Sequence, residues 1–246
     1  MLQDSFGRRF YYLRLSVTDL CNFRCNYCLP DGYQCAESIA AEQPLSVAEV
    51  ATVVRAFAAL GTEKVRLTGG EPSLRRDLPQ LIEAASRVAG IRRVAITTNG
   101  YKLSSQIDDW QRAGLSQLNV SLDSLDPQQF KAITGHDKLQ KILGGIDRAL
   151  ALGIPTKVNA VLLREHNLAE FNQFLDWIKV TPVSLRFIEL MRTGDNRDFF
   201  ASNHVAGSDI EQLLLRSGWL PVARARDDGP AKEYAHPDYA GRIGLI

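Results

Sequence analysis

The fold of this chain is decided by residues 11–28, YYLRLSVTDLCNFRCNYC. Leu13, Leu15 and Val17 alternate with polar neighbours, as residues do in a half-buried β-strand. Directly after this strand come three cysteines in the spacing CxxxCxxC. A strand that leads into a cysteine-rich loop predicts a domain built to present a metal or redox centre at the end of its first strand.

The three cysteines of this loop are Cys21, Cys25 and Cys28. Thiolates placed this closely are suited to three corners of a [4Fe–4S] cluster, which would leave the fourth iron open. A zinc site needs a fourth ligand, for which Cys35 is the nearest spare thiol. Packing as small apolar side chains is the remaining alternative. We interpret the loop as the site of one [4Fe–4S] cluster.

After the loop, the sequence alternates between helical and strand patterns. Helical patterns run from Ser46 to Gly61 and through 78–88, 103–113, 139–152, 168–178 and 209–216, with further strand patterns at 64–68, 94–97, 118–122, 156–162 and 185–188. Six strands separated by helices predict parallel pairing through right-handed crossovers. We expect an α/β domain, a partial six-stranded (β/α) barrel; the complete eight-stranded barrel and the doubly wound sheet are the alternatives.

The domain is expected to cover residues 1–222. Residues 223–246 end on GRIGLI and are expected to be the start of a C-terminal segment cut short. With 29 Lys and Arg against 28 Asp and Glu, no basic field favours nucleic acid. The chain shows neither a signal peptide nor a membrane-spanning apolar run, which predicts a cytoplasmic protein.

Polar and glycine residues follow the other strands at their carboxyl ends. Gly69 and Gly70 permit a tight turn and close approach of a ligand to the main chain, and Glu71 suits a ligand ammonium group. TTNG at 97–100 and SLD at 121–123 close the next two strands. In a barrel these strand ends meet at one site.

Basic residues occupy the strand faces opposite the apolar ones. Five cations follow this pattern: Arg14, Lys64, Arg66, Lys157 and Arg186. Ion pairs with core carboxylates would explain any single one. Five together also suit a polyanionic substrate such as a triphosphate.

The cysteine loop, with an aromatic residue before its last cysteine, and the GGEP motif after the second strand resemble the radical S-adenosylmethionine (SAM) superfamily. The resemblance implies that SAM chelates the open iron and that one electron cleaves it to a 5′-deoxyadenosyl radical. It also implies that Tyr27 packs near the adenine and that GGEP binds the SAM amino group.

The whole series YLRLSVTD, VRLTGGEPSLRRDL, TTNG, NVSLDSLD, RFIELM and DGPA is similar to the GTP 3′,8-cyclases of molybdenum cofactor biosynthesis. That family converts GTP to 3′,8-cyclo-7,8-dihydro-GTP. The resemblance implies SAM contacts at Tyr27, Gly69, Gly70, Glu71, Ser121 and Met191. It implies GTP contacts at Arg14, Lys64, Arg66, Thr97, Lys157 and Arg186.

The resemblance further implies an electron donor, a pathway protein that takes the cyclised product, and a possible homodimer. The family carries a second [4Fe–4S] cluster on C-terminal cysteines, which we expect to be absent from these 246 residues. A different radical SAM reaction, for example on a peptide, or a non-enzymatic iron–sulfur module are the alternative functions.

Overall fold

The computed structural model describes residues 3, 5–7, 9–34, 43–223 and 229–246 and divides the chain into two compact units. The first unit comprises residues 1–22, 31–119 and 141–155, and the second comprises residues 23–30, 120–140 and 156–246. Neither unit is continuous in sequence. Strand β4 (Gln117–Ser121) contributes residues to both.

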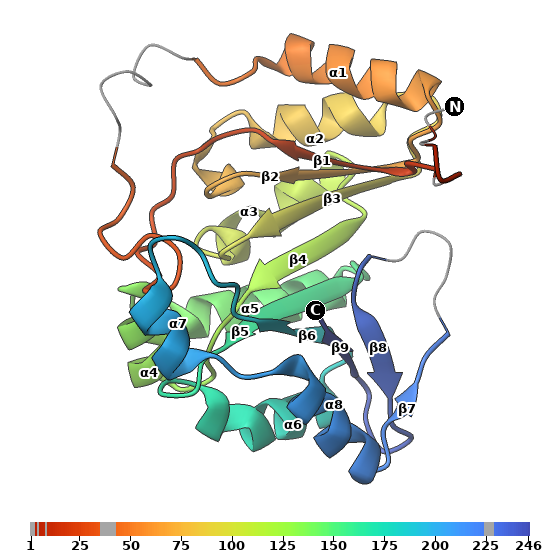
Figure 1. Cartoon of the computed structure of the whole chain (residues 1–246). Coiled ribbons are helices and arrows are strands. Elements are labelled where there is room, and N and C mark those ends of the chain that lie inside the picture. The colour runs from red at the N-terminus through yellow and green to blue at the C-terminus, as the bar shows by residue number, and fades with distance from the viewer. Residues whose placement is uncertain (1–2, 4, 8, 35–42, 224–228) are drawn as a thin grey trace. The chain divides into compact units, whose positions relative to one another are not determined.

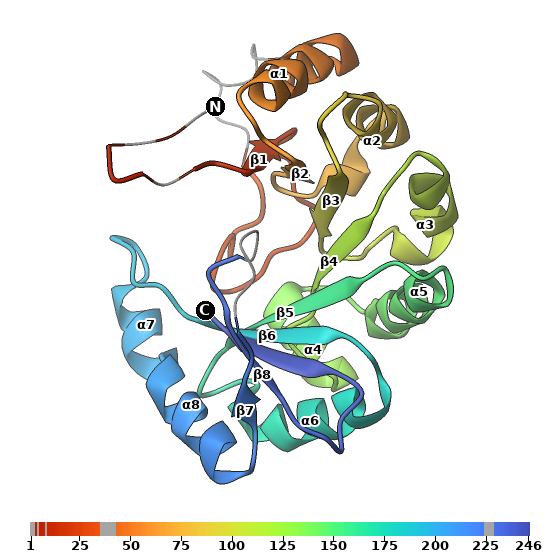
Figure 2. The same cartoon turned by 90° about the vertical axis from the view of Figure 1, so that its right-hand side faces the viewer.

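The first unit is built on strands that neighbour one another in the order β1-β2-β3-β4 (Figure 1). β1 pairs in parallel with β2, and β2 in parallel with β3. Helices α1, α2 and α3 lie on the same face of these strands (Figures 1 and 2). The bounds are β1 Tyr12–Ser16, α1 Val47–Ala59, β2 Lys64–Thr68, the 3-10 turn η1 Pro72–Leu74, α2 Leu78–Ser86, β3 Arg93–Thr98, α3 Leu103–Arg112 and α5 Leu139–Ala151.

In the second unit the strand order is β4-β5-β6-β9-β8-β7. β5, β6 and β9 pair in parallel, while β9, β8 and β7 pair antiparallel. The α/β class with a mostly parallel sheet is thus confirmed, and each of the six predicted strands is present. The bounds are α4 Pro127–Thr134, β5 Thr156–Leu162, η2 Leu168–Glu170, α6 Phe171–Val180, β6 Ser184–Glu189, α7 Arg197–Asn203, α8 Gly207–Arg216, β7 Leu220–Pro221, β8 Lys232–Ala235 and β9 Arg242–Leu245.

The core of each unit uses the apolar faces that the alternation predicts. Val65 and Leu67 of β2 are fully buried, whereas Arg66 between them is half-buried. In the second unit, Phe174 of α6 packs edge-on against Phe187 of β6, with ring centroids 5.7 Å apart. Burial of such aromatic rings is the main source of stability in an interior of this size.

Helix α1 begins where the sequence predicts it. The Ser46 hydroxyl accepts from the Glu49 backbone N–H at 3.3 Å, and the Glu49 carboxylate accepts from the Ser46 N–H at 2.8 Å. The Ser46 N–H, and after it the Ser46 hydroxyl, donate to the Glu49 carboxylate and lower its pKa. The two bonds from backbone N–H groups satisfy two of the backbone donors that a helix start leaves unpaired.

The structure adds elements that the sequence pattern did not predict, namely α4, α7 and the strands β7, β8 and β9. The predicted helix at 168–178 begins as the short turn η2 and continues as α6. Residues 229–246 lie in the second unit, where β9 pairs with β6. The domain boundary expected after residue 222 stays a prediction.

None of the described helices combines the length and apolar character that a bilayer-spanning helix needs.

Arg75 links three segments of the first unit. Its guanidinium donates to the backbone oxygens of Val17 at 2.9 Å and Leu45 at 2.7 Å. It also donates to both carboxylate oxygens of Asp77, at 2.9 and 2.6 Å, which lowers the pKa of Asp77. The fork geometry of arginine fits this set of acceptors, and a lysine ammonium does not.

Replacing Arg75 by Lys is expected to lower the free energy of unfolding by about 2 kcal/mol, because several charge-assisted hydrogen bonds are lost. Urea unfolding at pH 7 measures the effect. Asp77 has a depressed pKa, so its contribution is present at neutral pH and is lost as the pH falls below 4. The difference between the variant and the wild type should therefore shrink at pH 3.

Arg87→Lys is the matched control, since the Arg87–Glu83 pair is exposed on the surface of α2. It should change stability by less than about 0.5 kcal/mol. Equal losses in the two variants would contradict the role given to Arg75.

Candidate functional site

The glycine motif after β2 contacts the start of the cysteine loop through the main chain. The Gly70 N–H donates to the Thr18 oxygen at 2.8 Å, and the Glu71 N–H donates to the Leu20 oxygen at 2.7 Å. A Cβ atom on Gly69 would lie 2.0 Å from the Thr18 oxygen, and one on Gly70 would lie 2.2 Å from the Leu20 oxygen. Gly69 also has a φ of +146°. The two glycines are thus required for close approach of the chain to itself, and their predicted contact with a ligand stays a prediction.

Glu71 is completely buried beneath this contact. Its carboxylate accepts from the Ser73 N–H at 2.9 Å, the Thr98 hydroxyl at 2.6 Å and the Asn99 N–H at 2.6 Å. Burial raises the pKa of Glu71, and these hydrogen bonds oppose the rise. Glu71 therefore joins the carboxyl ends of β2 and β3.

The TTNG segment extends this connection to the cysteine loop. The Asn99 side-chain amide donates to the Asn22 side-chain oxygen at 2.9 Å, next to Cys21. Both residues belong to the first unit. The chain on both sides of Cys21 is thus held by hydrogen bonds to the segments that follow β2 and β3.

The rest of the loop, residues 23–30, belongs to the second unit. The Arg24 and Asn26 N–H groups donate to the last carbonyls of α4, those of Thr134 at 3.1 Å and Ile133 at 3.0 Å. Phe23 stacks on His136 with ring centroids 4.8 Å apart. Helix α4 is therefore the unpredicted element that supports this half of the loop.

Tyr27, between the last two cysteines, points to a buried carboxylate. Its hydroxyl donates to Asp123 Oδ2 at 2.8 Å, and the Val161 N–H donates to Asp123 Oδ1 at 2.8 Å. Burial raises the pKa of Asp123 to about 6. Burial first, and the Asp123 carboxylate second, raise the pKa of Tyr27. Sequence analysis noted Asp123 only as a strand end.

The cysteines divide between the units. Cys21 is half-buried in the first unit, while Cys25 is half-buried and Cys28 exposed in the second. Partial burial of the Cys28 thiol, and after it the Asp123 charge, raise the pKa of that thiol. Among the residues that the structure describes, no three His, Cys, Asp or Glu side chains form a ready-made metal site. The metal assignment therefore rests on the donor chemistry of the motif.

The predicted GTP contacts of the first unit lie on β1, β2 and β3. Arg14 is exposed and opposite Arg66 in the register of β1 and β2. The cations of Lys64 and Arg66 lie over the Tyr12 ring, 5.3 and 5.2 Å from its centroid. The buried Thr97 hydroxyl oxygen has no hydrogen-bond partner in the described structure.

In the second unit, Lys157 and Arg186 share a carboxylate. The Arg186 guanidinium is 2.9 Å from Glu233 Oε1, and the Lys157 ammonium is 3.8 Å from the same atom. Only 5% of the Arg186 side chain is exposed, and its Nε has no hydrogen-bond partner among the described atoms. Sequence analysis missed Glu233 because it lies in the segment assigned to the tail.

The remaining predicted SAM contacts lie at the ends of strands in the second unit. Ser121 is half-buried at the end of β4. Met191 is 75% exposed and lies two residues after β6.

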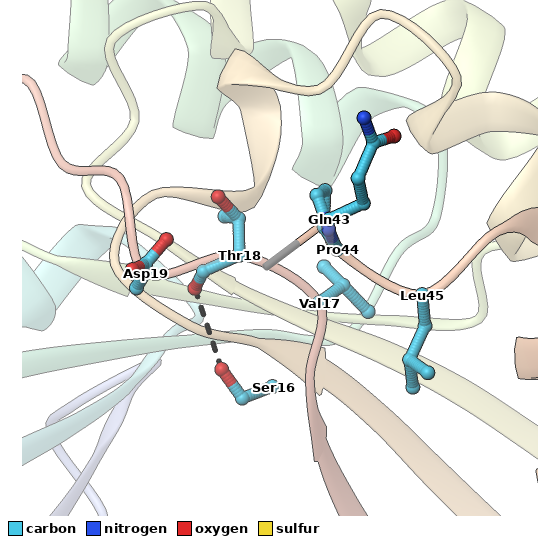
Figure 3. Close-up of a pocket in the computed structure, with 7 residues that line it drawn as sticks. All are labelled: Ser16, Val17, Thr18, Asp19, Gln43, Pro44 and Leu45. Atoms are coloured by element: carbon cyan, nitrogen blue, oxygen red, sulfur yellow. Dashed lines mark hydrogen bonds between the residues drawn. The ribbon is translucent and has the colours of Figure 1, made fainter. Parts of the chain in front are cut away.

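A cavity of about 380 Å³ lies in the first unit, beside the chain that leads from β1 into the cysteine loop (Figure 3). The Ser16 hydroxyl donates to the Thr18 oxygen in its wall, at 3.3 Å. The lining residues are Ser16, Val17, Thr18, Asp19, Gln43, Pro44 and Leu45, none of which is a predicted site residue.

Comparison with known proteins places this geometry in a family. A model of the radical SAM superfamily matches residues 15–178, which include the cysteine loop and the glycine motif. A GTP 3′,8-cyclase of Pectobacterium atrosepticum is 56% identical over all 246 residues, which span 74% of that relative. The chain belongs to the GTP 3′,8-cyclase family of the radical SAM superfamily. Another cyclase of this family, from Actinobacillus pleuropneumoniae serotype 5b, is 54% identical over the whole chain, which spans 72% of it.

Solved structures share the fold of this family member at low sequence identity. Streptococcus suis SuiB bound to S-adenosylmethionine has a TM-score of 0.69 at 14% identity, over 85% of this chain and 47% of SuiB. The protein anSMEcpe with bound AdoMet has a TM-score of 0.62 at 14% identity, over 85% of this chain and 59% of its own. These likenesses support the α/β architecture.

The main-chain contact of Gly70 gives a direct test. In Gly70→Ala, the new Cβ would collide with the Leu20 backbone, so the segment leading to Cys21 must shift. We expect a loss of at least about 2 kcal/mol in the free energy of unfolding, together with reduced iron uptake on anaerobic reconstitution.

Gly144→Ala on α5 is the matched control, because a Cβ atom there meets nothing within 4 Å. It should keep or slightly raise stability, since alanine favours a helix over glycine. Normal stability and iron uptake in Gly70→Ala would show that the close contact is dispensable.

Proposed function

We propose that this chain is a radical SAM GTP 3′,8-cyclase, which converts GTP to 3′,8-cyclo-7,8-dihydro-GTP in molybdenum cofactor biosynthesis. The observation that carries the proposal is identity of 54–56% with such cyclases along the whole chain. The cysteine loop and the GGEP motif lie within the matched region, so the residues that define radical SAM chemistry are included.

Cys21, Cys25 and Cys28 are the proposed ligands of one [4Fe–4S] cluster, which fits a set of three thiols. When bound, the cluster and SAM supply a one-electron cleavage that yields a 5′-deoxyadenosyl radical. The main chain of Gly70 holds the part of the loop that belongs to the first unit, and the Tyr27 hydroxyl holds the part that belongs to the second. Residues 1–246 are proposed to bind this one cluster and not the second cluster of the family.

The proposed SAM contacts are Tyr27, Gly69, Gly70, Glu71, Ser121 and Met191. The Glu71 carboxylate accepts three hydrogen bonds from the protein, which shape the loop, and one of its roughly four acceptor positions stays for the SAM amino group. The exposed Met191 side chain offers an apolar surface for the ligand.

The proposed GTP contacts are Arg14, Lys64, Arg66, Thr97, Lys157 and Arg186. Their charges suit a triphosphate, and two buried polar atoms, Thr97 Oγ1 and Arg186 Nε, have hydrogen-bonding capacity to offer a ligand. Glu233 already pairs with Lys157 and Arg186. Phosphate oxygens of GTP would therefore have to interact with these two cations more favourably than the Glu233 carboxylate does.

The family further supports a cytoplasmic enzyme that takes electrons from a reductant and passes its product to the next protein of the pathway. A homodimer is part of the same proposal.

Anaerobic reconstitution tests the radical chemistry. About four irons per chain are expected, because one three-cysteine site carries one cubane. With SAM and dithionite, the reconstituted protein should form 5′-deoxyadenosine. Cys25→Ala should abolish both iron binding and this product, whereas Cys35→Ala should retain them. Iron retained in Cys25→Ala, or lost in Cys35→Ala, would refute the ligand assignment.

Calorimetry with GTP tests the substrate. Arg66→Ala is expected to weaken GTP binding tenfold or more, because a charge-assisted contact to phosphate is lost. Arg112→Ala is the matched control, since its side chain is 69% exposed on α3. GTP affinity in Arg66→Ala within twofold of the control would count against the triphosphate assignment and favour a different radical SAM substrate.

A further inference from the structure

The Asp123 carboxylate has no role in the chemistry described above, yet it contacts the cysteine loop. It is buried, with 3% of its surface exposed, at the end of the chain segment that follows β4. Its two oxygens accept different donors, the Tyr27 hydroxyl at Oδ2 and the Val161 N–H at Oδ1. Asp123 therefore joins the loop to β5.

Asn167 fixes Asp123 from the opposite side. The fully buried Asn167 amide donates to the Asp123 backbone oxygen at 2.6 Å and to the Val161 oxygen at 2.8 Å. Its own oxygen accepts from the Leu163 N–H at 2.7 Å. Because every polar atom of the Asn167 side chain is engaged, the backbone around Asp123 has little freedom to move.

Tyr27 transmits this rigidity to the loop. It lies between Cys25 and Cys28, which form a turn in which the Cys28 N–H donates to the Cys25 oxygen at 2.9 Å. A tyrosine ring has two side-chain torsions, and the hydrogen bond at its far end restricts both. The direction of the ring and the shape of the turn are then set together.

We propose that Asp123 is a positioning residue of this family member: through Tyr27, it orients the aromatic ring and the Cys25–Cys28 turn for SAM binding. The inference rests on the proposed radical SAM function. It assigns Asp123 no contact with SAM or with the reacting atoms: each of its oxygens already accepts from a protein donor, and its role is carried through Tyr27.

Asp123→Asn, Tyr27→Phe and the double variant test the proposal. Asparagine keeps the shape and can still accept from Val161, but its NH₂ group faces the Tyr27 hydroxyl, so the charge-assisted bond to a carboxylate is lost and only a weaker, neutral bond of reversed direction can replace it. Phenylalanine keeps the ring and removes the donor. Asp126→Asn is the matched control, because Asp126 caps α4 three residues later and asparagine is an equally good cap.

The measurements are iron content after reconstitution, the electron paramagnetic resonance spectrum of the reduced protein, and its change on SAM titration. Each single variant should bind roughly four irons per chain. Each should bind SAM about tenfold more weakly and change the SAM-dependent spectrum. The double variant should bind SAM no worse than Tyr27→Phe, because that single variant already removes the bond. The control should match the wild type.

SAM affinity within twofold of the wild type in both single variants would overturn the proposal, as would losses that multiply in the double variant. Should Asp123→Asn fail to fold, SAM affinity within twofold of the wild type in Tyr27→Phe alone would still overturn the proposal, because that variant removes the bond to Asp123. A wild type that binds iron but not SAM would overturn the proposed function and this inference with it. Normal wild-type binding with unaffected variants would overturn the inference alone.

Discussion

The close main-chain contact between the Gly69–Gly70 turn and residues 18–20 is the constraint on which the first unit's part of the site depends. Only residues without a Cβ permit it, since any side chain would overlap the Thr18 or Leu20 oxygen. Hydrogen bonds from Gly70 and Glu71 follow from that proximity. Buried below, the Glu71 carboxylate then joins the ends of β2 and β3. One steric condition thus orders the chain that leads to Cys21.

Much of this architecture was predictable from the sequence because it depends on local rules. The Ser46–Glu49 capping box and the apolar faces of β2 follow from hydrogen bonding and period-2 alternation, which are encoded within a few residues. Helix α4 also has local signals, an Asp126–Pro127 start and Gly135 at its end, which were overlooked. β7, β8 and β9 were missed because short strands carry too few residues for a clear period.

The contacts within the site were harder to predict than the family to which the protein belongs. The cysteine spacing and the GGEP motif indicated a radical SAM protein, and the family match bears this out. However, the sequence could not show that Glu71 accepts three hydrogen bonds from protein donors or that Glu233 pairs with Arg186. Such pairings join residues that are far apart along the chain, and they depend on register and burial instead of on local pattern. The individual SAM and GTP contacts stay predictions.

The discontinuity of the two units has a consequence for synthesis. Residues 23–30 belong with residues 120–140 and 156–246, so a growing chain makes Cys25 and Cys28 long before Asp123 and Asn167 exist. At ordinary translation rates this delay is on the order of ten seconds. During that time the nascent chain carries its thiols without the side chains that later hold the loop. The part of the loop that holds Cys25 and Cys28 is thus completed only after the segment around Asn167 has been synthesised.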